Sequence, residues 1–282
     1  MLNDPETPQK PPRRPHPLEQ RPPERDPANE ERRRIILHIP VTPPTITYAL
    51  IALNTVIFVV GFFVISPDQL NALYDWGATN RESVLVMGEY HRLLTAMFLH
   101  GGLAHIAFNM YALYAIGQTV ERFFGHFRFA LVYFLGGLAG SVLSVLLNGP
   151  QVFSVGASGA VFAIVGGEMA FLYKHRKLLG DMGRAQLRQL IIIAGINFAF
   201  GFATTVDSGG VNIDNWGHIG GLIGGLIVAW IISPLFLIQR HPENPQALMT
   251  YDSNPLQRQT QPLLAYFSGL LAILIAASIL AR

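Results

Sequence analysis

The stretch ITYALIALNTVIFVVGFFVI, residues 46–65, contains twenty residues and no charged side chain. A helix of about 20 apolar residues is long enough to cross the ~30 Å hydrocarbon core of a bilayer. The whole chain is 50% hydrophobic and only 13% charged, whereas a soluble domain has about 25% charged residues. The stretch and the composition together predict an integral membrane protein.

Six further apolar runs follow this one along the chain. They cover approximately residues 103–120, 129–148, 158–173, 190–206, 216–238 and 263–280. A soluble fold could bury one or two such helices in its core, but it does not need seven. The sequence therefore predicts an all-α polytopic membrane protein. We expect a six-helix core in residues 41–238, a linker in 239–262 and one additional C-terminal transmembrane helix in 263–282.

The N-terminal segment, residues 1–40, differs from the rest of the chain. Its first 34 residues contain 15 charged side chains and nine prolines, and no apolar run of the kind found in a signal peptide. Such a segment cannot bury enough apolar surface to offset the entropy of ordering it. We therefore expect a disordered, Pro/Arg-rich tail.

The positions of Lys and Arg predict the orientation in the membrane. If the N-terminus is cytoplasmic, 17 of the 20 Lys and Arg residues lie on the cytoplasmic side, including those of the linker 239–262. Only Arg81, Arg92 and Arg282 then lie outside. This bias agrees with the positive-inside rule. The 37-residue connection 66–102 would be an outer loop, and it is long enough to have structure of its own.

Polar residues occur near the start of three of the predicted helices. His105 and Asn109 lie four residues apart, on one face of the second helix. Ser158 opens the fourth helix, and His218 lies near the start of the sixth. Because alternate helices run in the same direction, these residues should all lie in the outer leaflet. Ionisable groups at membrane depth are functional candidates by default.

The fourth helix is unusually short. Residues 158–173 span roughly 24 Å at 1.5 Å per residue, which is less than the ~30 Å core. The preceding segment, residues 148–157, must then dip into the membrane. Irregular backbone is tolerated there only when it is buried in protein or lines a water-filled cavity. We therefore predict a polar hollow that opens outward, with Ser158 at its floor.

Small residues indicate that the fourth and sixth helices pack closely. Gly217, Gly221 and Gly225 form a GxxxGxxxG repeat on the sixth helix, and Gly159 follows Ser158 on the fourth. Such faces let helix backbones approach each other. Helix packing alone would explain these glycines, but close approach would also bring Ser158 within ~3 Å of a histidine that could act as its base.

Taken together, three motifs resemble the rhomboid family of intramembrane serine proteases. They are HGGLAHIAFNM (100–110), GASGAVFA (156–163) and GHIGGLIGG (217–225), in order and on alternate helices. The segments 88–100 and 120–125 also resemble the family's outer loop and its second-helix exit. The resemblance covers roughly residues 45–238, and the seventh helix matches the family's form with six helices plus one.

The resemblance implies a mechanism and the residues that perform it. Ser158 would be the nucleophile and His218 the general base, without an aspartate. His105, Asn109 and the backbone N–H of Ser158 would stabilise the oxyanion. Gly156 would let the backbone approach the substrate carbonyl, with Gly159, Phe162 and Gly221 in supporting positions. No metal or other cofactor is implied, and the chain has no cysteine.

Two positions depart from the family pattern. Phe162 stands where well-studied members have a tyrosine, so ring stacking on the histidine remains but a hydroxyl contact does not. His91 precedes Arg92 where the outer loop often reads Trp-Arg. For Glu121 and Arg122, at the end of the second helix, we favour a structural role.

The expected function is an endopeptidase that hydrolyses peptide bonds in or near transmembrane segments of other membrane proteins, close to the outer leaflet. Its partners would be the lipid bilayer and single-span or other membrane proteins, with no nucleic acid. The alternative is a rhomboid-like protein that binds such clients without cutting them. A transporter would need polar groups through the full membrane depth or an internal repeat, and the sequence has neither. We expect a prokaryotic plasma membrane, with the active site opening outward.

Overall fold

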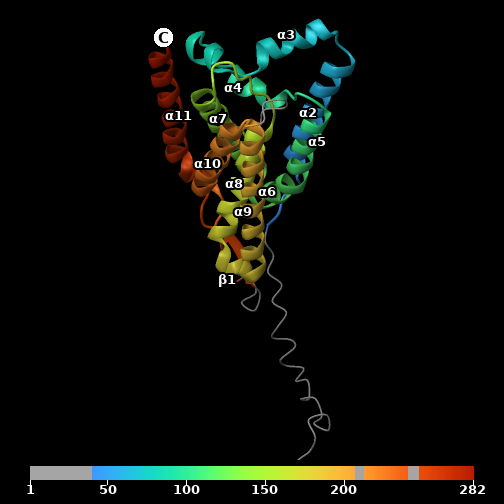
Figure 1. Cartoon of the computed structure of the whole chain (residues 1–282). Helices are drawn as coiled ribbons and strands as arrows, with labels where there is room; N and C mark the ends of the chain where they lie inside the picture. The colour runs from blue at the N-terminus through green and yellow to red at the C-terminus, as the bar shows by residue number, and fades with distance from the viewer. Residues whose placement is uncertain (1–39, 207–212, 241–247) are drawn as a thin grey trace, which may run out of the picture.

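The structure, a computed structural model, describes residues 40–206, 213–240 and 248–282 (Figure 1). The predicted disordered tail therefore lies outside the described residues, apart from its last residue. Nearly all of the regular structure is helical, as the sequence predicted. The elements in chain order are α2 (Thr45–Phe63), α3 (Pro67–Gly77), η1 (Glu82–Val86), α4 (Arg92–Thr95), η2 (Ala96–Phe98), α5 (Leu103–Ala112), η3 (Leu113–Gly117), α6 (Gln118–Phe124), α7 (His126–Leu147), α8 (Ser158–Lys174), α9 (Arg176–Val206), α10 (Asn215–Ile232), β1 (Phe236–Arg240), β2 (Leu248–Asp252), η4 (Leu256–Gln259) and α11 (Thr260–Ala281).

Helices of membrane-spanning length account for most of the fold. Within the described residues, α2, α7, α9, α10 and α11 with η4 before it are long and apolar enough to cross a bilayer. A sixth candidate is formed by residues 92–98 and 103–124, which are bent by 94° at the break between them. Helix α8 has 17 residues, of which 12 are buried. With α8 included, the helices correspond to the seven apolar runs of the sequence.

The core of the molecule is the packing of α7, α8 and α10. A Cβ atom on Gly221 would collide with the carbonyl oxygen of Gly159, and one on Gly225 would collide with that of Ala163. The backbones of α8 and α10 are therefore in direct contact, as the glycine repeat predicted. The short helix α8 is surrounded by protein in the middle of the bundle, as Figure 1 shows.

The predicted outer loop contains several short helices. Helix α3 begins with a capping box, in which Ser66 and Gln69 satisfy each other's backbone N–H groups. Helices α3 and α4 lie at one end of the bundle, whereas β1 lies at the other end (Figure 1). Arg92 is buried and donates to the carbonyl oxygen of Ala78 and to Glu89, so it joins two parts of this loop.

Glu121 has the structural role that we favoured for it. Its carboxylate is fully buried and accepts hydrogen bonds from the backbone N–H groups of Ile46 and Thr47, at 2.8 and 2.7 Å. It also contacts the Thr47 hydroxyl and His126 Nδ1, both at 2.6 Å. Glu121 thus satisfies free N–H groups at the start of α2 and fastens that helix to the end of α6.

The sixth helix ends earlier than predicted. The sequence suggested a helix to about Ile238, but α10 ends at Ile232. Pro234 is the physical reason, because the residue before a proline is disfavoured in the helical region. Ser233 accordingly has a ψ of 139°. The residues that follow form β1, which pairs antiparallel with β2, so the predicted linker 239–262 contains one strand of a hairpin and a short helix rather than plain coil.

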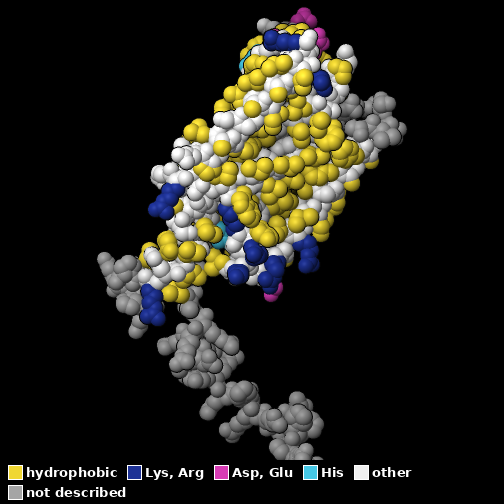
Figure 2. All heavy atoms as spheres, turned by 90° about the vertical axis from the view of Figure 1, so that its left-hand side faces the viewer, with side chains coloured by type: hydrophobic (Ala, Val, Ile, Leu, Met, Phe, Trp, Pro, Cys, Tyr) yellow, Lys and Arg dark blue, Asp and Glu magenta, His cyan; other side chains and the backbone are white. Residues whose placement is uncertain are grey.

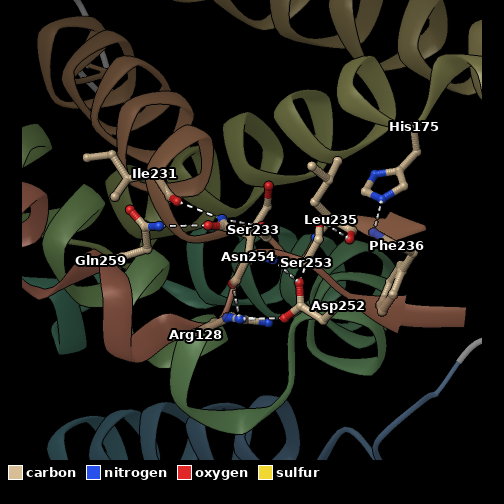
Figure 3. Close-up of polar contacts among 10 residues, drawn as sticks. All are labelled: Arg128, His175, Ile231, Ser233, Leu235, Phe236, Asp252, Ser253, Asn254 and Gln259. Atoms are coloured by element: carbon tan, nitrogen blue, oxygen red, sulfur yellow. Dashed lines mark hydrogen bonds and ion pairs between the residues drawn. The ribbon is translucent and has the colours of Figure 1, made fainter.

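The hairpin closes the lower end of the bundle in Figure 1 through side chains that bind backbone groups (Figure 3). Asn254 donates to the carbonyl oxygens of Ile231 and Ser233, both at 2.9 Å, and so caps the end of α10. Arg128, near the start of α7, donates to Asp252 and to the Asn254 carbonyl at 2.7 Å. This set of contacts fixes where the chain turns back into α11.

Helix α11 packs on the outside of the bundle, on the side opposite α2 (Figure 1). The Tyr266 hydroxyl donates to the Leu135 carbonyl oxygen of α7 at 3.2 Å. Near the other end of α11, the Tyr90 hydroxyl donates to Ser278 at 3.4 Å. The additional helix is therefore attached to both the core and the outer loop.

The surface has the distribution of side chains expected in lipid. Figure 2 shows a broad hydrophobic face along the bundle, with Lys and Arg gathered towards its two ends. Large apolar side chains such as Leu264, Ile273 and Leu280 are at least half exposed. A soluble monomer rarely exposes so large an apolar surface, whereas a bilayer would cover it.

Candidate functional site

The predicted site residues lie at or near the starts of α5, α8 and α10. Ser158 is the first residue of α8, and His218 is the fourth residue of α10. His105 and Asn109 lie on α5. We refer to this end of the bundle as the Ser158 end, and to the opposite end, where β1 and β2 lie, as the hairpin end.

Backbone contact sets the relative position of Ser158 and His218. A Cβ atom on Gly159 would lie 3.3 Å from the carbonyl oxygen of Gly217. The residues directly after Ser158 and directly before His218 therefore touch. In the described part of the chain no hydrogen bond joins Ser158 to His218. Catalytic hydrogen bonds are often long in the absence of substrate, so the arrangement remains compatible with proton transfer.

Phe162 holds the His218 ring in place. The two rings are stacked, with centroids 4.6 Å apart and planes inclined by 21°. The Phe162 ring also stacks with the ring of Phe198 on α9, and the centroids of these two rings are 5.3 Å apart. Among the described residues, His218 Nδ1 is buried and has no hydrogen-bond partner. Ring packing rather than a carboxylate therefore orients this imidazole, as the sequence predicted from Phe162.

Gly156 brings the loop before Ser158 against α5. Its φ of +128° is rare for residues with a side chain. A Cβ atom at this position would lie 2.6 Å from His105 Nε2 and 3.8 Å from Asn109 Nδ2. Only glycine fits this close to the His105 ring. The structure therefore places His105 and Asn109 beside the loop that leads into Ser158.

His105 and Asn109 differ in how they are held. Asn109 is buried, and its amide donates to the His105 carbonyl oxygen at 3.0 Å. His105 is half-buried, and its ring lies edge-on to that of His100, with centroids 5.2 Å apart. Asn109 is thus held by a backbone group of α5, and His105 is held by a ring contact with the residues that precede α5.

The sequence analysis missed His100. This residue is 2% exposed, and its Nε2 lies 3.5 Å from the backbone N–H of Ala157, which precedes Ser158. It lies in the segment HGGLAH, where two histidines flank a Gly-Gly pair. The bend of 94° at this point brings the two histidine rings together. A hydropathy pattern does not reveal such a bend, but the Gly-Gly pair could have suggested it.

A small pocket next to Ser158 contains further polar residues that the sequence analysis missed. It is lined in part by Ser141, Ser154, Ser158, Asp214 and Gly217. Asp214 is the N-cap of α10 and accepts a hydrogen bond from the Gly217 N–H at 2.8 Å. An Asp directly before an apolar helix is a recognisable capping signal, so this residue could have been identified from the sequence.

The site contains side chains suited to acid–base and nucleophilic chemistry. Ser158 is a potential nucleophile and His218 a potential base. The first N–H groups of α8 have no partner within the helix, and no side chain of the described residues caps them. Within the described residues there is no group of three or more His, Cys, Asp or Glu side chains that could hold a metal ion. The site as described therefore has the components of acyl-transfer chemistry.

Comparisons with known proteins agree with the sequence motifs. The Rhomboid domain model matches residues 87–235, which is more than half of the 282-residue chain. Rhomboid protease GluP of Bacillus subtilis is 40% identical over 187 residues, covering 66% of this chain and 34% of that protein. Two Arabidopsis thaliana proteins are also similar. RHOMBOID-like protein 6, mitochondrial, is 36% identical over 156 residues, with coverages of 55% and 48%. RHOMBOID-like protein 1 is 33% identical over 185 residues, with coverages of 65% and 45%.

The matches span less than half the length of each of these relatives. The match to the family model includes α5, α8 and α10, and it also includes the residues of the site. This protein therefore belongs to the Rhomboid family and is an integral, multi-pass membrane protein.

Proposed function

We propose that this protein is an intramembrane serine endopeptidase that hydrolyses peptide bonds in or near the transmembrane segments of other membrane proteins. Membership of the Rhomboid family supports the proposal, as does the 40% identity to a protein named as a rhomboid protease. The relative with that name is about three times as long as the matched segment. The proposal therefore also depends on the geometry of the site.

The observation that carries the proposal is the convergence of three helix starts around Ser158. Backbone contact at Gly159 and Gly217 joins α8 to α10, and Phe162 orients the His218 ring. On the other side, Gly156 leaves no space between the loop and His105. Ser158, His218 and His105 therefore lie at one end of the bundle, and this placement supports the roles of nucleophile, base and hydrogen-bond donor that we propose for them.

In the proposed reaction, Ser158 Oγ attacks the carbonyl carbon of the scissile bond while His218 accepts the hydroxyl proton. Negative charge then develops on the carbonyl oxygen. The N–H of Ser158, together with His105 and Asn109, would donate hydrogen bonds to this oxyanion. The N–H of Ser158 is well suited to this role, because the first N–H groups of a helix have no partner within it and carry partial positive charge.

The second half of the reaction uses the same groups. Protonated His218 gives its proton to the leaving amine as the C–N bond breaks, and Ser158 remains acylated. A water molecule then loses a proton to His218 and attacks the ester carbonyl carbon. As the ester C–O bond breaks, His218 returns this proton to Ser158 Oγ, which restores the serine hydroxyl and releases the carboxylic acid. The polar pocket lined in part by Ser158 is where this water would be held.

The orientation of the protein follows from the distribution of Lys and Arg. With the N-terminus cytoplasmic, 17 of the 20 basic residues lie inside, in agreement with the positive-inside rule. Helices α5, α8 and α10 then start on the outer side, and the Ser158 end opens towards the outside of a prokaryotic plasma membrane. Substrates would need a weak helix near that boundary, because a fully hydrogen-bonded helix cannot present an extended backbone to Ser158.

The test of this function is cleavage of a fluorescent single-span substrate in proteoliposomes. We expect wild-type protein to cleave it and Ser158→Ala and His218→Ala to have no measurable activity. Ser268→Ala, which changes an exposed serine on α11, is the matched control and should cleave as the wild type does. Cleavage that persists in Ser158→Ala would eliminate the proposed mechanism. If folded wild-type protein cuts no member of a varied substrate panel, the non-cleaving client-binding function would replace it.

A further inference from the structure

The carboxylate of Asp214 is the acceptor of four hydrogen bonds at the Ser158 end. Its Oδ2 accepts from the hydroxyls of Ser144 and Ser154, at 2.6 and 2.5 Å. Its Oδ1 accepts from the amide of Asn148 and from the backbone N–H of Gly217, both at 2.8 Å. A carboxylate can accept about four hydrogen bonds, so the capacity of this side chain is fully used.

The four donors come from three different parts of the chain. Ser144 lies in the last turn of α7, and Asn148 is the residue that ends this helix. Ser154 lies in the segment 148–157, which leads into Ser158, and Gly217 lies in the first turn of α10. Asp214 therefore joins α7, α10 and the loop before the nucleophile through a single side chain.

Gly217 makes this position of the carboxylate possible. A Cβ atom on Gly217 would lie 2.6 Å from Asp214 Oδ2, which is too close for a side chain. The glycine directly before His218 thus has a second role besides the contact with Gly159 on α8. It leaves the space that the Asp214 side chain fills.

The loop before Ser158 is also fixed on its other side. Thr79 and Ser154 exchange backbone hydrogen bonds of 3.0 and 2.8 Å, and the Gly156 N–H donates to the Ala96 carbonyl oxygen at 2.8 Å. These contacts fasten the loop to residues 66–102. These contacts do not connect the loop to α10. Among the described contacts of the loop, the side-chain hydrogen bonds to Asp214 provide that connection, because Asp214 is the N-cap of α10, the helix of His218.

We propose that Asp214 is a positioning residue that holds the Ser158 loop and the start of α10 in register, so that Ser158 and His218 face each other. Asp214 lies four residues before His218, and its partner Ser154 lies four residues before Ser158. The two members of the proposed dyad are thus each one short segment away from the same hydrogen bond. This inference rests on the proposed function for its effect on catalysis, but the link itself does not depend on activity.

The first experiment measures how fast a fluorophosphonate probe labels Ser158 in purified protein. Loss of the link should displace the reacting groups, and a misplacement of about 1 Å can reduce a rate on the order of 100-fold. We expect a reduction of this size in Asp214→Ala and a smaller one in Asp214→Asn, whose amide oxygen can still accept. Asn254→Ala is the matched control, because it removes the cap at the other end of α10, and it should label within about threefold of wild type.

The second experiment follows hydrogen exchange of the backbone N–H groups of Ser154 and Gly156. We expect faster exchange at both in Asp214→Ala and unchanged exchange in Asn254→Ala. If Asp214→Ala does not fold, Ser154→Ala removes one of the four hydrogen bonds alone, and it should give a smaller effect in the same direction on labelling and on Gly156 exchange.

The outcomes separate the two proposals. A wild-type protein that is folded but neither labels nor cleaves would remove the proposed function, and the exchange measurement would still decide on the link. Folded Asp214→Ala that labels within threefold of an active wild type would overturn the positioning role. Unchanged exchange at Ser154 and Gly156 would overturn it as well, whatever the activity.

Discussion

The two ends of the core each contain a histidine packed against phenylalanine, but the two rings are held in different ways. At the hairpin end, His175 Nδ1 donates to the Phe171 carbonyl oxygen at 2.9 Å. The other ring nitrogen, Nε2, accepts from the Phe236 N–H at 3.1 Å (Figure 3). At the Ser158 end, His218 is stacked on Phe162, and its buried Nδ1 has no partner among the described residues.

This difference indicates which histidine can take part in a reaction. Both nitrogens of His175 are used by the backbone, so the ring joins α8 to β1 and has no free position for a substrate. His218 is oriented by stacking, which fixes the plane of the ring without using its nitrogens. Packing therefore supplies orientation at the Ser158 end, and hydrogen bonding supplies attachment at the hairpin end. Substitutions at the Ser158 end should therefore change activity, and substitutions at the hairpin end should change stability.

The largest expected effect is on activity at the Ser158 end. Gly156→Ala would place a Cβ atom 2.6 Å from His105 Nε2, so either the loop or His105 must move. A displacement of about 1 Å should reduce the cleavage rate roughly 100-fold. Gly125→Ala is the control, since Gly125 also has a positive φ, of 78°, but has no atom within 4 Å of the added Cβ.

We expect Gly125→Ala to lower the free energy of unfolding by about 1–2 kcal/mol, the usual strain of that conformation, with little change in the cleavage rate. Cleavage and thermal unfolding should be measured on both variants in the same detergent. Equal cleavage rates in Gly156→Ala and Gly125→Ala would show that the loop backbone does not need to approach His105.

The next effect is on stability at the hairpin end. Arg128→Ala removes the hydrogen bonds to Asp252 and to the Asn254 carbonyl oxygen. Charged hydrogen bonds of this kind contribute about 2 kcal/mol, so the unfolding transition should shift to lower temperature. The cleavage rate per folded molecule should stay within about threefold of wild type, because Arg128 is at the end opposite Ser158.

Arg184→Ala is the matched control for Arg128→Ala. It removes an ion pair with Asp181 whose side chains are 60% and 96% exposed, and such surface pairs contribute less than about 0.5 kcal/mol. A large loss of activity in Arg128→Ala at full stability would mean that the two ends are coupled. Stability at the hairpin end and activity at the Ser158 end would then not be independent of each other.

The smallest effect concerns pH and His175. Burial lowers the pKa of His175, with Lys174 acting in the same direction, while the hydrogen bond to Phe171 and the charge of Asp252 oppose the change. The folded protein therefore binds a proton here less readily than the unfolded chain, whose pKa is about 6.5. The stabilising contact is present above that pH and is lost as the pH falls below it.

We expect the unfolding temperature of wild-type protein to fall more between pH 7.5 and pH 5.5 than that of His175→Gln. The glutamine side chain can still accept from the Phe236 N–H, but it cannot titrate. The difference between the two proteins should be smaller than the effect of Arg128→Ala. If both lose the same stability over this range, protonation of His175 does not weaken the hairpin end.

Much of the fold could be predicted from the sequence, because membrane helices are determined by local composition. An apolar run of about 20 residues has few alternatives to a helix in lipid. The seven runs, the short α8 and the glycine contact between α8 and α10 were accordingly predicted. The end of α10 was not, because apolar residues continue past Pro234 into β1. Hydropathy does not distinguish a strand from the last turns of a helix.

The sequence by itself determined the family resemblance, the apolar helices and the identities of Ser158 and His218 as site candidates, since these depend on residue types and on spacing within one helix. Tertiary structure alone decided the polar contacts that His100 and Asp214 make with distant parts of the chain. His100 reaches the Ala157 N–H only because the chain bends before α5. Asp214 gathers donors from α7 and from the Ser158 loop, separated from it by 60 to 70 residues of chain. Side-chain hydrogen bonds between segments so far apart depend on packing, and no local pattern in the sequence specifies them.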